Sequence, residues 1–267
     1  MLKVDRTAIK EFLFQTGISL SEEQTNTFQR AYFKYQHLIS SLLYASDLHR
    51  LAHQYEAGKP YWYLDLYNRH FKELRKKKLK ILEIGVGGYT APKAGGGSLR
   101  MWQNYFPNST IYGIDIYEKK FHEDKRIKIY QGSQVDQVFL NSLVEEAGGF
   151  DIIIDDGSHI NEHVMTTFEL LFPFLSSHGL YVVEDTHTSY WDNFGGSVDK
   201  QSKTMMNYFR NLCDEINYEE YCEKEHKPTL YQSQIVGMHF YHSVLIVEKG
   251  DNTKGSYERG KIINPID

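Results

Sequence analysis

The sequence predicts an α/β fold in which a mainly parallel, doubly wound sheet ends in an antiparallel strand. From Leu79 onward, short apolar runs alternate with amphipathic segments, which is the pattern of a parallel sheet covered by helices on both faces. Near the C-terminus, the apolar runs 235–241 and 243–249 follow each other too closely for a parallel crossover. These two runs therefore indicate an antiparallel hairpin at the end of the sheet.

Each element follows from its own pattern. Buried strands are expected at the apolar runs 79–86, 110–117, 126–132, 150–157 and 179–186, before the final hairpin. Helices are expected at 98–106, 137–148, 164–175 and 203–215. Apolar residues at three- and four-residue spacing predict further helices at 8–17, 27–58 and 61–71, with Ser21 resembling a helix start. The chain thus divides into an N-terminal helical region, residues 1–76, and an α/β domain, residues 77–267.

Composition limits the class of protein. The 267 residues are 41% hydrophobic and 24% charged, which is ordinary for a globular protein. The formal net charge of −5 gives no general attraction to nucleic acid or to an anionic membrane. No apolar run is long enough to span a bilayer, and the two cysteines form no metal-binding motif. We therefore expect a cytoplasmic protein without a membrane span and without a nucleic-acid partner.

Acidic residues follow the fourth and fifth predicted strands. Asp155 and Asp156 end one strand, and Glu184 and Asp185 end the next. The carboxyl ends of parallel strands form the ligand-binding edge of an open α/β sheet, so these acids should converge. Their mutual repulsion would be relieved by a cation, and oxygen ligands favour a hard cation, with Mg²⁺ first and Mn²⁺ or Ca²⁺ as alternatives. We predict Asp156, Glu184 and Asp185 as the metal ligands, with Asp155 in a supporting role.

A histidine lies next to this predicted metal site. His159 follows Asp156 by three residues, in the turn beyond the fourth strand. Transfer of a group to an alcohol requires removal of the hydroxyl proton, and an imidazole titrates near neutrality. His159 is therefore the predicted general base, with His163 and His187 as competitors for the role and helix capping as its purely structural alternative.

A glycine-rich strand end indicates a nucleoside site. The first strand ends in Glu83-Ile84-Gly85-Val86-Gly87, and the second strand ends in Asp115, which can accept hydrogen bonds from ribose hydroxyls. The third glycine of a dinucleotide fingerprint is absent, and an acid precedes the first glycine. This ExGxG pattern with a following acid is the one that methyltransferases use for S-adenosylmethionine. Glu83 is expected to face the sulfonium or amino end of that cofactor.

Further cofactor contacts are expected around this strand end. The glycines at 95–97 open the next helix, so Ser98 is either its N-cap or part of a close approach to the cofactor carboxylate. The loop after the third strand would lie beside the adenine, with Gln134 and Asp136 as partners of its amine. The full set of predicted cofactor-binding residues is Glu83, Gly85, Gly87, Tyr89, Ser98, Asp115, Gln134, Asp136 and Asp155.

Four motifs in order carry a resemblance to a known family. The stretches LEIGVGGYTAPKAGGGSLRMWQNYFP, YGIDIYEKKFHEDKRIKIYQGSQVD, FDIIIDDGSHINEHV and LYVVEDTHTSYWDNFGG closely resemble the macrocin and mycinamicin sugar O-methyltransferases. The resemblance covers about residues 79–197. It implies the seven-stranded, Rossmann-like class I methyltransferase fold for residues 77–267. Mg²⁺ on Asp156, Glu184 and Asp185, and His159 as the base, are implied as well.

The resemblance also implies a partner and an assembly. It predicts methylation of a sugar hydroxyl, in a secondary metabolite or in a surface polysaccharide precursor, by a homo-oligomeric enzyme. Tyr190 and Trp191 are aromatic candidates for contact with the acceptor. The chain differs from the family in having Ser133 where Asp is frequent, and only a short helical region is expected where the larger antibiotic enzymes carry a long N-terminal domain. A phenolic or phosphorylated acceptor, and an inactive cofactor-binding module, remain as alternatives.

Overall fold

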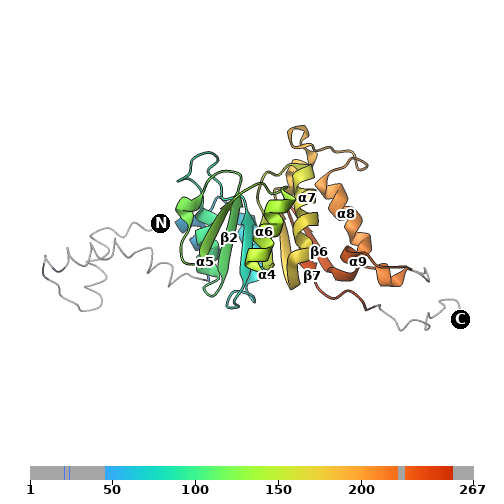
Figure 1. Ribbon diagram of the computed structural model, residues 1–267, viewed down its shortest axis with the longest axis horizontal. Coiled ribbons are helices and arrows are strands. Elements are labelled where there is room, and N and C mark those ends of the chain that lie inside the picture. Colours follow the sequence, from blue (N-terminus) through green and yellow to red (C-terminus); the bar gives the residue numbers. More distant parts are fainter. Residues whose placement is uncertain (1–20, 22–23, 25–45, 222–225, 255–267) are drawn as a thin grey trace.

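The computed structural model describes residues 21, 24, 46–221 and 226–254. These residues form a seven-stranded sheet in the order β3-β2-β1-β4-β5-β7-β6 (Figure 1). Strands β1 to β5 pair in parallel, whereas β7 is antiparallel to both β5 and β6, so the predicted fold class is confirmed. The strands are β1 (Lys80–Ile84), β2 (Thr110–Asp115), β3 (Ile127–Gln131), β4 (Phe150–Asp155), β5 (Leu175–Glu184), β6 (Ile235–Tyr241) and β7 (Val244–Lys249).

Helices cover both faces of the sheet (Figure 1). One face packs against α3 (Leu48–Tyr55), α4 (Tyr61–Phe71) and α5 (Gly97–Tyr105). The other face packs against α6 (Gln137–Ala147), α7 (Asn161–Leu171) and α8 (Met205–Glu215). Shorter elements are α9 (Leu230–Gln234) and the 3-10 turns η1 (Lys120–His122), η2 (Phe172–Phe174), η3 (Thr186–Tyr190), η4 (Asp192–Phe194) and η5 (Tyr218–Glu220). In the part of the chain described here, no helix is long and apolar enough to cross a membrane.

Two predicted boundaries shift for local reasons. Helix α7 ends at Leu171, before the predicted limit of residue 175, because Pro173 cannot continue a helix and a 3-10 turn follows. Strand β5 begins at Leu175, four residues before the predicted start at 179. Phe150 of β4 pairs with Leu175, but Ile152 pairs with Leu180, so β5 has extra residues between these two pairs. The irregular register at this point accommodates them.

The N-terminal helices α3 and α4 pack directly on the sheet. Leu51, Tyr67 and Phe71 are fully buried in the same apolar cluster as Trp102 of α5. Helix α3 starts after Asp47, whose carboxylate accepts a hydrogen bond from the backbone of Arg50. Helix α4 reaches the carboxyl end of β5 through Tyr63 and Tyr67, whose hydroxyls contact Asp185 and Glu184.

Part of the predicted helical region lies outside the described residues. This applies to the predicted helix 8–17 and to most of the predicted helix 27–58. Within the described positions, the side chains of Ser21 and Gln24 exchange hydrogen bonds with each other's backbone, as at a helix start. The division of the chain at residue 76 stays a prediction.

Candidate active site

The predicted acids meet at the carboxyl edge of the sheet. Strand register explains why: Ile84 of β1 pairs with Asp155 of β4, and Asp155 pairs with Val183 of β5. The residues that follow these pairs therefore leave the sheet side by side. We call Glu83, Asp156, Glu184 and Asp185 the acid cluster.

A buried lysine lies inside the acid cluster. Lys59, in the connection between α3 and α4, has a side chain that is only 2% exposed. Its ammonium contacts three carboxylates, those of Glu83 at 2.9 Å, Asp156 at 2.6 Å and Glu184 at 2.7 Å. Breaking a buried ion pair of this length is costly, because it leaves an unpaired charge away from water. Part of the negative charge at this edge is therefore balanced by the chain itself.

The pKa values in the cluster follow from burial and charge. Burial lowers the pKa of Lys59, but the attraction of Asp156, Glu184 and Glu83 together raises it well above its ordinary value. The ammonium is therefore charged at any physiological pH. Burial, followed by repulsion from Asp156, raises the pKa of Glu184, against the opposing effect of Lys59. Burial also raises the pKa of Glu83, and Lys59 again opposes the shift.

Helix α4 adds two tyrosines beneath the acids. The hydroxyl of Tyr63 donates to Asp185 Oδ1 at 2.6 Å, and the hydroxyl of Tyr67 donates to Glu184 Oε1. Both rings are buried. The sequence suggests the aromatic residues of 61–67 only as contacts with a sugar ring and does not predict that Tyr63, Tyr67 or Lys59 holds the acids. These residues precede their partners at the ends of β4 and β5 by 97 to 122 residues and belong to no motif. The only local signal in the sequence is the abundance of aromatic residues in the segment 61–71.

His159 faces two of the predicted metal ligands. Its Nε2 lies 3.9 Å from Asp156 Oδ1 and 3.7 Å from Asp185 Oδ2. One ligand atom from each of the three residues lies within 4.8 Å of the others. Oxygen donors from two aspartates suit a hard divalent cation, so the donor set fits Mg²⁺ at this position. Glu184 belongs to a second group with Glu83 and Asp156, and Asp156 is common to both groups.

The backbone at this position is unusual. His159 and Asp185 both adopt positive φ angles, of 56° and 53°, which few residues other than glycine tolerate. Thr188 links the two turns, since its hydroxyl lies 2.9 Å from the carbonyl oxygens of both His159 and Asp185. Such conformations persist only where the surrounding structure enforces them, and they are concentrated at functional sites.

The two competing histidines make other contacts. His163 Nδ1 lies 2.9 Å from the hydroxyl of Ser158, and His187 Nδ1 lies 3.0 Å from the hydroxyl of Ser243. Of the three histidines, His159 is the one whose ring lies within 4 Å of acid-cluster carboxylates. The geometry thus favours His159 as the proton acceptor over its competitors.

The glycine-rich turn after β1 provides a close backbone approach. Gly85 has a φ of 92°, and a Cβ there would lie 2.1 Å from the carbonyl oxygen of Asp156, so only glycine fits. A Cβ at Gly87 would meet nothing closer than 3.8 Å, which leaves open space beside this turn. Asp115 accepts hydrogen bonds from the backbone of Val86 and Tyr117, both at 2.9 Å. A carboxylate has further lone pairs, so ribose hydroxyls can still bind there.

Other predicted cofactor residues have structural partners in the described chain. Gln134 is buried and donates to Asp155 at 3.2 Å while it accepts from the backbone of Ser158 at 2.8 Å. Burial raises the pKa of Asp155 to about 7. Asp136 caps α6, and its Oδ1 accepts from two backbone groups. The roles of Gln134, Asp136 and Asp155 as cofactor contacts stay predictions.

The structure also shows where the predicted cofactor residues Tyr89 and Ser98 lie. The N-cap of α5 is Gly96, in a left-handed conformation, and not Ser98, which is buried in the first turn. Ser98 is also near enough to Glu83 to lower the pKa of that carboxyl slightly. Tyr89 is 85% exposed on the glycine-rich turn. Their predicted contacts with a cofactor remain predictions.

The predicted acceptor aromatics lie on the surface beyond β5. Tyr190 and Trp191 are each about half exposed, and the ring of Trp191 lies edge-on to His187 at 4.7 Å. Trp62 of α4 is similarly exposed and stacks on His242. Exposed aromatic rings near a polar edge are well suited to contact the apolar face of a sugar.

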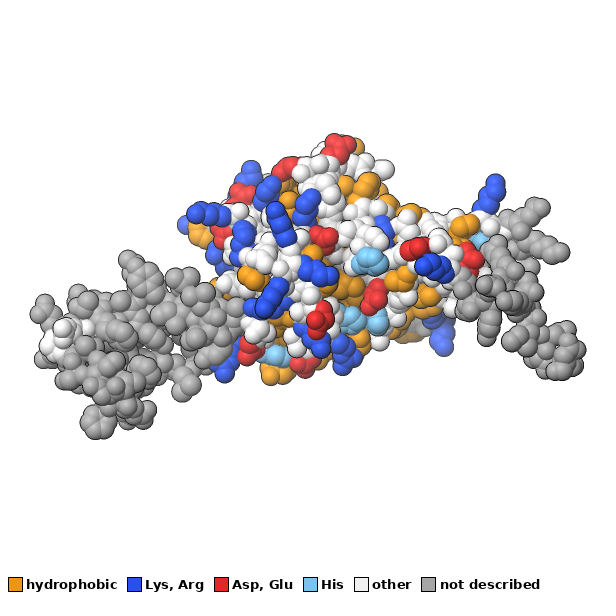
Figure 2. All heavy atoms as spheres, turned by 90° about the horizontal axis from the view of Figure 1, so that it is seen from below, with side chains coloured by type: hydrophobic (Ala, Val, Ile, Leu, Met, Phe, Trp, Pro, Cys, Tyr) orange, Lys and Arg blue, Asp and Glu red, His pale blue; other side chains and the backbone are white. Residues whose placement is uncertain are grey.

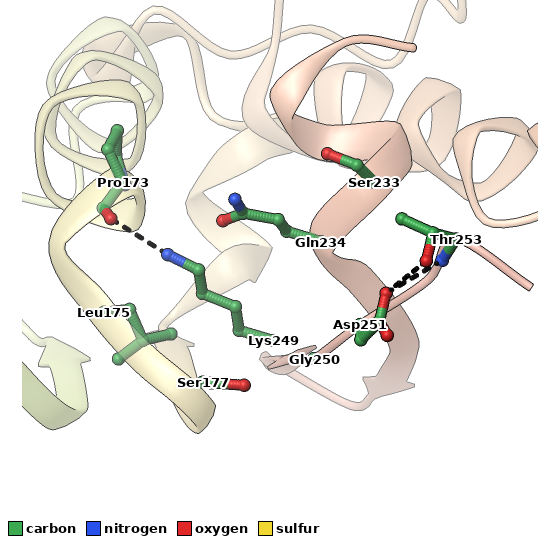
Figure 3. A pocket seen from close by; sticks show the side chains of 9 residues that line it. All are labelled: Pro173, Leu175, Ser177, Ser233, Gln234, Lys249, Gly250, Asp251 and Thr253. Carbon is green, nitrogen blue, oxygen red and sulfur yellow. Dashed lines mark hydrogen bonds between the residues drawn. The ribbon is translucent and has the colours of Figure 1, made fainter.

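A pocket on the molecule is separate from this edge. It is lined by Pro173, Leu175, Ser177, Ser233, Gln234, Lys249, Gly250, Asp251 and Thr253 (Figure 3). Leu175 begins β5 and Glu184 ends it, so the pocket lies at the opposite end of the strand from the acid cluster. In Figure 3 the ammonium of Lys249 points at the carbonyl of Pro173, to which it donates a hydrogen bond of 2.9 Å. None of the predicted site residues lines this pocket.

Comparison with known proteins identifies relatives. No protein-family model matches the chain. Mycinamicin VI 2''-O-methyltransferase of Micromonospora griseorubida is 45% identical over 215 residues, which cover 78% of this chain and 54% of the relative. Demethylmacrocin O-methyltransferase of Streptomyces fradiae is 43% identical with the same coverage. The chain thus spans about half the length of the curated relatives that it matches.

Solved structures agree with these relatives. MycE methyltransferase from the mycinamycin biosynthetic pathway, in complex with Mg and SAH, matches with a TM-score of 0.75 at 45% identity. The match covers 78% of this chain and 56% of MycE. Fold and strand order are therefore those of the class I methyltransferases. Within that class, the chain is a homologue of the macrocin- and mycinamicin-type sugar O-methyltransferases, which confirms the resemblance predicted from its motifs.

Proposed function

We propose that the protein is an S-adenosylmethionine-dependent, Mg²⁺-assisted O-methyltransferase that acts on a sugar hydroxyl. The acceptor would be part of a secondary metabolite or of a surface polysaccharide precursor. The observation that carries the proposal is the position of His159, within 4 Å of both Asp156 and Asp185. The glycine-rich turn and Asp115 lie at the same edge of the sheet. The homology to sugar O-methyltransferases supports the same acceptor class.

The cofactor would bind along the ends of β1 and β2. A bound S-adenosylmethionine supplies an electrophilic methyl group. Gly85 and Gly87 would let the backbone approach it closely, and the remaining lone pairs of Asp115 would accept hydrogen bonds from its ribose hydroxyls. Glu83 is fully buried and pairs with Lys59, so its contact with the cofactor remains a prediction. The homologous MycE was solved in complex with SAH, the product form of this cofactor.

The metal would bind between Asp156 and Asp185, with Glu184 as the third predicted ligand. Mg²⁺ held there would supply positive charge that makes the acceptor hydroxyl more acidic. Tyr63 holds Asp185, and Tyr67 and Lys59 hold Glu184, so each carboxylate is fixed before an ion enters. His159 Nε2, which lies within 4 Å of both aspartates, would accept the acceptor's proton. Alignment and charge stabilisation supply the rest of the rate enhancement.

The proposal is tested with an acceptor panel. The protein is incubated with S-adenosylmethionine and Mg²⁺ and with deoxysugar glycosides, a catechol and a sugar phosphate, and release of S-adenosylhomocysteine is measured. Turnover on glycosides alone supports the proposal. Turnover on the catechol or the phosphate alone would replace the acceptor class. Cofactor binding without turnover on any acceptor would favour an inactive module.

We further propose that the enzyme is a cytoplasmic homo-oligomer. The family resemblance supports an assembly of identical subunits. Light scattering after size-exclusion chromatography tests the assembly directly, because a single species at the monomer mass of 31.2 kDa would contradict it.

A further inference from the structure

A second group of potential metal ligands lies outside the acid cluster. It consists of His70 in the last turn of α4, His239 on β6 and Glu248 on β7. Glu248 lies four residues along β7 from Val244, the partner of Glu184, which separates the two groups by roughly 13 Å along the strand. This group is independent of the proposed methyl transfer. Figure 2 shows histidine side chains beside acidic ones on the face that is lowermost in Figure 1.

The fold brings the three side chains to one face. In the antiparallel register, His239 is opposite Ile246 and Glu248 is opposite Gly237, so His239 and Glu248 are diagonal neighbours on the same side of the sheet. Ile246 belongs to the apolar cluster that packs under α4, so this is the side that α4 covers. His70 reaches the pair from the helix.

The distances suit a small tetrahedral ion. His239 Nε2 lies 2.8 Å from Glu248 Oε1, and His70 Nδ1 lies 3.9 Å from the same oxygen. Ligand atoms on a tetrahedral Zn²⁺ with bonds of about 2.05 Å are separated by about 3.4 Å. The two distances bracket this separation, and one ligand atom from each residue lies within 4.8 Å of the others.

A second contact orients the buried imidazole. His70 Nε2 lies 2.9 Å from the hydroxyl of Tyr241, which leaves Nδ1 facing Glu248. Metal-bound histidines are usually held in this way through their other nitrogen. Burial, the neighbouring His239 and Arg69 lower the pKa of His70, whereas Glu248 opposes them. The guanidinium of Arg69 lies over the ring of Tyr241, and its positive charge disfavours a cation beside His70.

We propose that His70, His239 and Glu248 form a second metal site, which binds Zn²⁺ or a similar borderline transition-metal ion with water as the remaining ligand. Two imidazoles and one carboxylate favour such ions over Mg²⁺. His239 and Glu248 are more than a third exposed, so an ion can enter from solvent. The bound ion joins α4 to β6 and β7. Because α4 also carries Tyr63 and Tyr67, the site stiffens the support of the acid cluster.

The test uses the full chain, stripped with a chelator and then saturated with Mg²⁺ to occupy the acid cluster. Co²⁺ is titrated in, and the visible absorption of tetrahedral Co²⁺ is recorded, followed by displacement with Zn²⁺. The wild-type protein should bind one equivalent. His239→Ala and Glu248→Gln should each weaken Co²⁺ binding at least 10-fold. This is a lower limit, because changing a residue that only supports a metal ligand already weakens binding about 10- to 100-fold. His53→Ala, an exposed histidine on α3, is the matched control and should bind like wild type.

Thermal unfolding gives a second readout. Zn²⁺ should raise the midpoint of wild type and of His53→Ala but leave that of His239→Ala unchanged. The conservative Glu248→Gln variant keeps the shape of the side chain, so its far-ultraviolet circular dichroism should match wild type. Absence of a Co²⁺ spectrum in wild type overturns the proposal. Equal Co²⁺ affinity in wild type, His239→Ala and Glu248→Gln would overturn it as well.

Discussion

Replacing Lys59 by methionine tests the electrostatic account of the acid cluster. The substitution keeps the aliphatic stem but removes the ammonium that contacts Glu83, Asp156 and Glu184 at 2.6 to 2.9 Å. The side chains of Glu83 and Glu184 are at most 2% exposed, so water cannot replace the lost partner. Removing one member of a buried ion pair costs about 3–5 kcal/mol. We expect a loss of this size in the free energy of unfolding of the metal-free protein.

The assay is urea unfolding in the presence of a chelator, with thermal unfolding as a check. For a protein of this size, that loss corresponds to a decrease of about 6–20 °C in the midpoint. Lys125→Met, at an exposed position, is the control and should change stability by less than about 0.5 kcal/mol. Added Mg²⁺ should stabilise Lys59→Met more than wild type, because the variant has more unbalanced carboxylate charge. Equal stability of Lys59→Met and Lys125→Met would refute the reasoning.

Three further predictions follow from single contacts. Gly85→Ala should destabilise the protein by more than about 1 kcal/mol and weaken cofactor binding in calorimetry, since its Cβ would lie 2.1 Å from a carbonyl oxygen. Gly195→Ala has a similar positive φ without a clash, and an equal effect there would contradict the steric argument. Tyr67→Phe should cost about 1.5–3 kcal/mol, because it removes a hydrogen bond to a buried carboxylate. Tyr181→Phe, which removes a buried hydroxyl without a hydrogen-bond partner, should be neutral or stabilising in the same unfolding assay. Burial lowers the pKa of Lys249 to about 8, so the unfolded chain holds this proton to higher pH than the folded one. Between pH 8 and pH 10, the free energy of unfolding should therefore rise by about 1 kcal/mol more in wild type than in Lys249→Met, after allowance for solvent screening. Parallel pH profiles of the two proteins would exclude this pKa shift.

The sequence predicted the sheet well because buried parallel strands have a strong local signal. The run Ile152-Ile153-Ile154 is fully buried between two helical layers, and its ending in acids located the ligand-binding edge. The ends of elements were less predictable. Helix α7 stops before Pro173, while β5 begins earlier than its apolar run because of an irregular register that only the partner strand reveals.

The contacts that hold the acids could not be predicted from local pattern. Repulsion among the carboxylates indicated a cation, and the predicted cation was a metal ion. In the structure, the ammonium of Lys59 also neutralises them, from a connection 97 residues before Asp156. Tyr67 is 117 residues from Glu184. Such contacts depend on how α4 packs on the sheet, which the sequence of α4 alone does not specify.

The central claim is that His159 accepts the proton in a metal-assisted methyl transfer, and one comparison tests it most directly. His159→Ala and His163→Ala are assayed for S-adenosylhomocysteine release with Mg²⁺ and a glycoside acceptor, and for cofactor affinity by calorimetry. We predict that His159→Ala loses about 10²–10⁴-fold in turnover with unchanged cofactor affinity, while His163→Ala stays close to wild type. Wild-type turnover in His159→Ala, or an equal loss of turnover and cofactor affinity, would contradict the account.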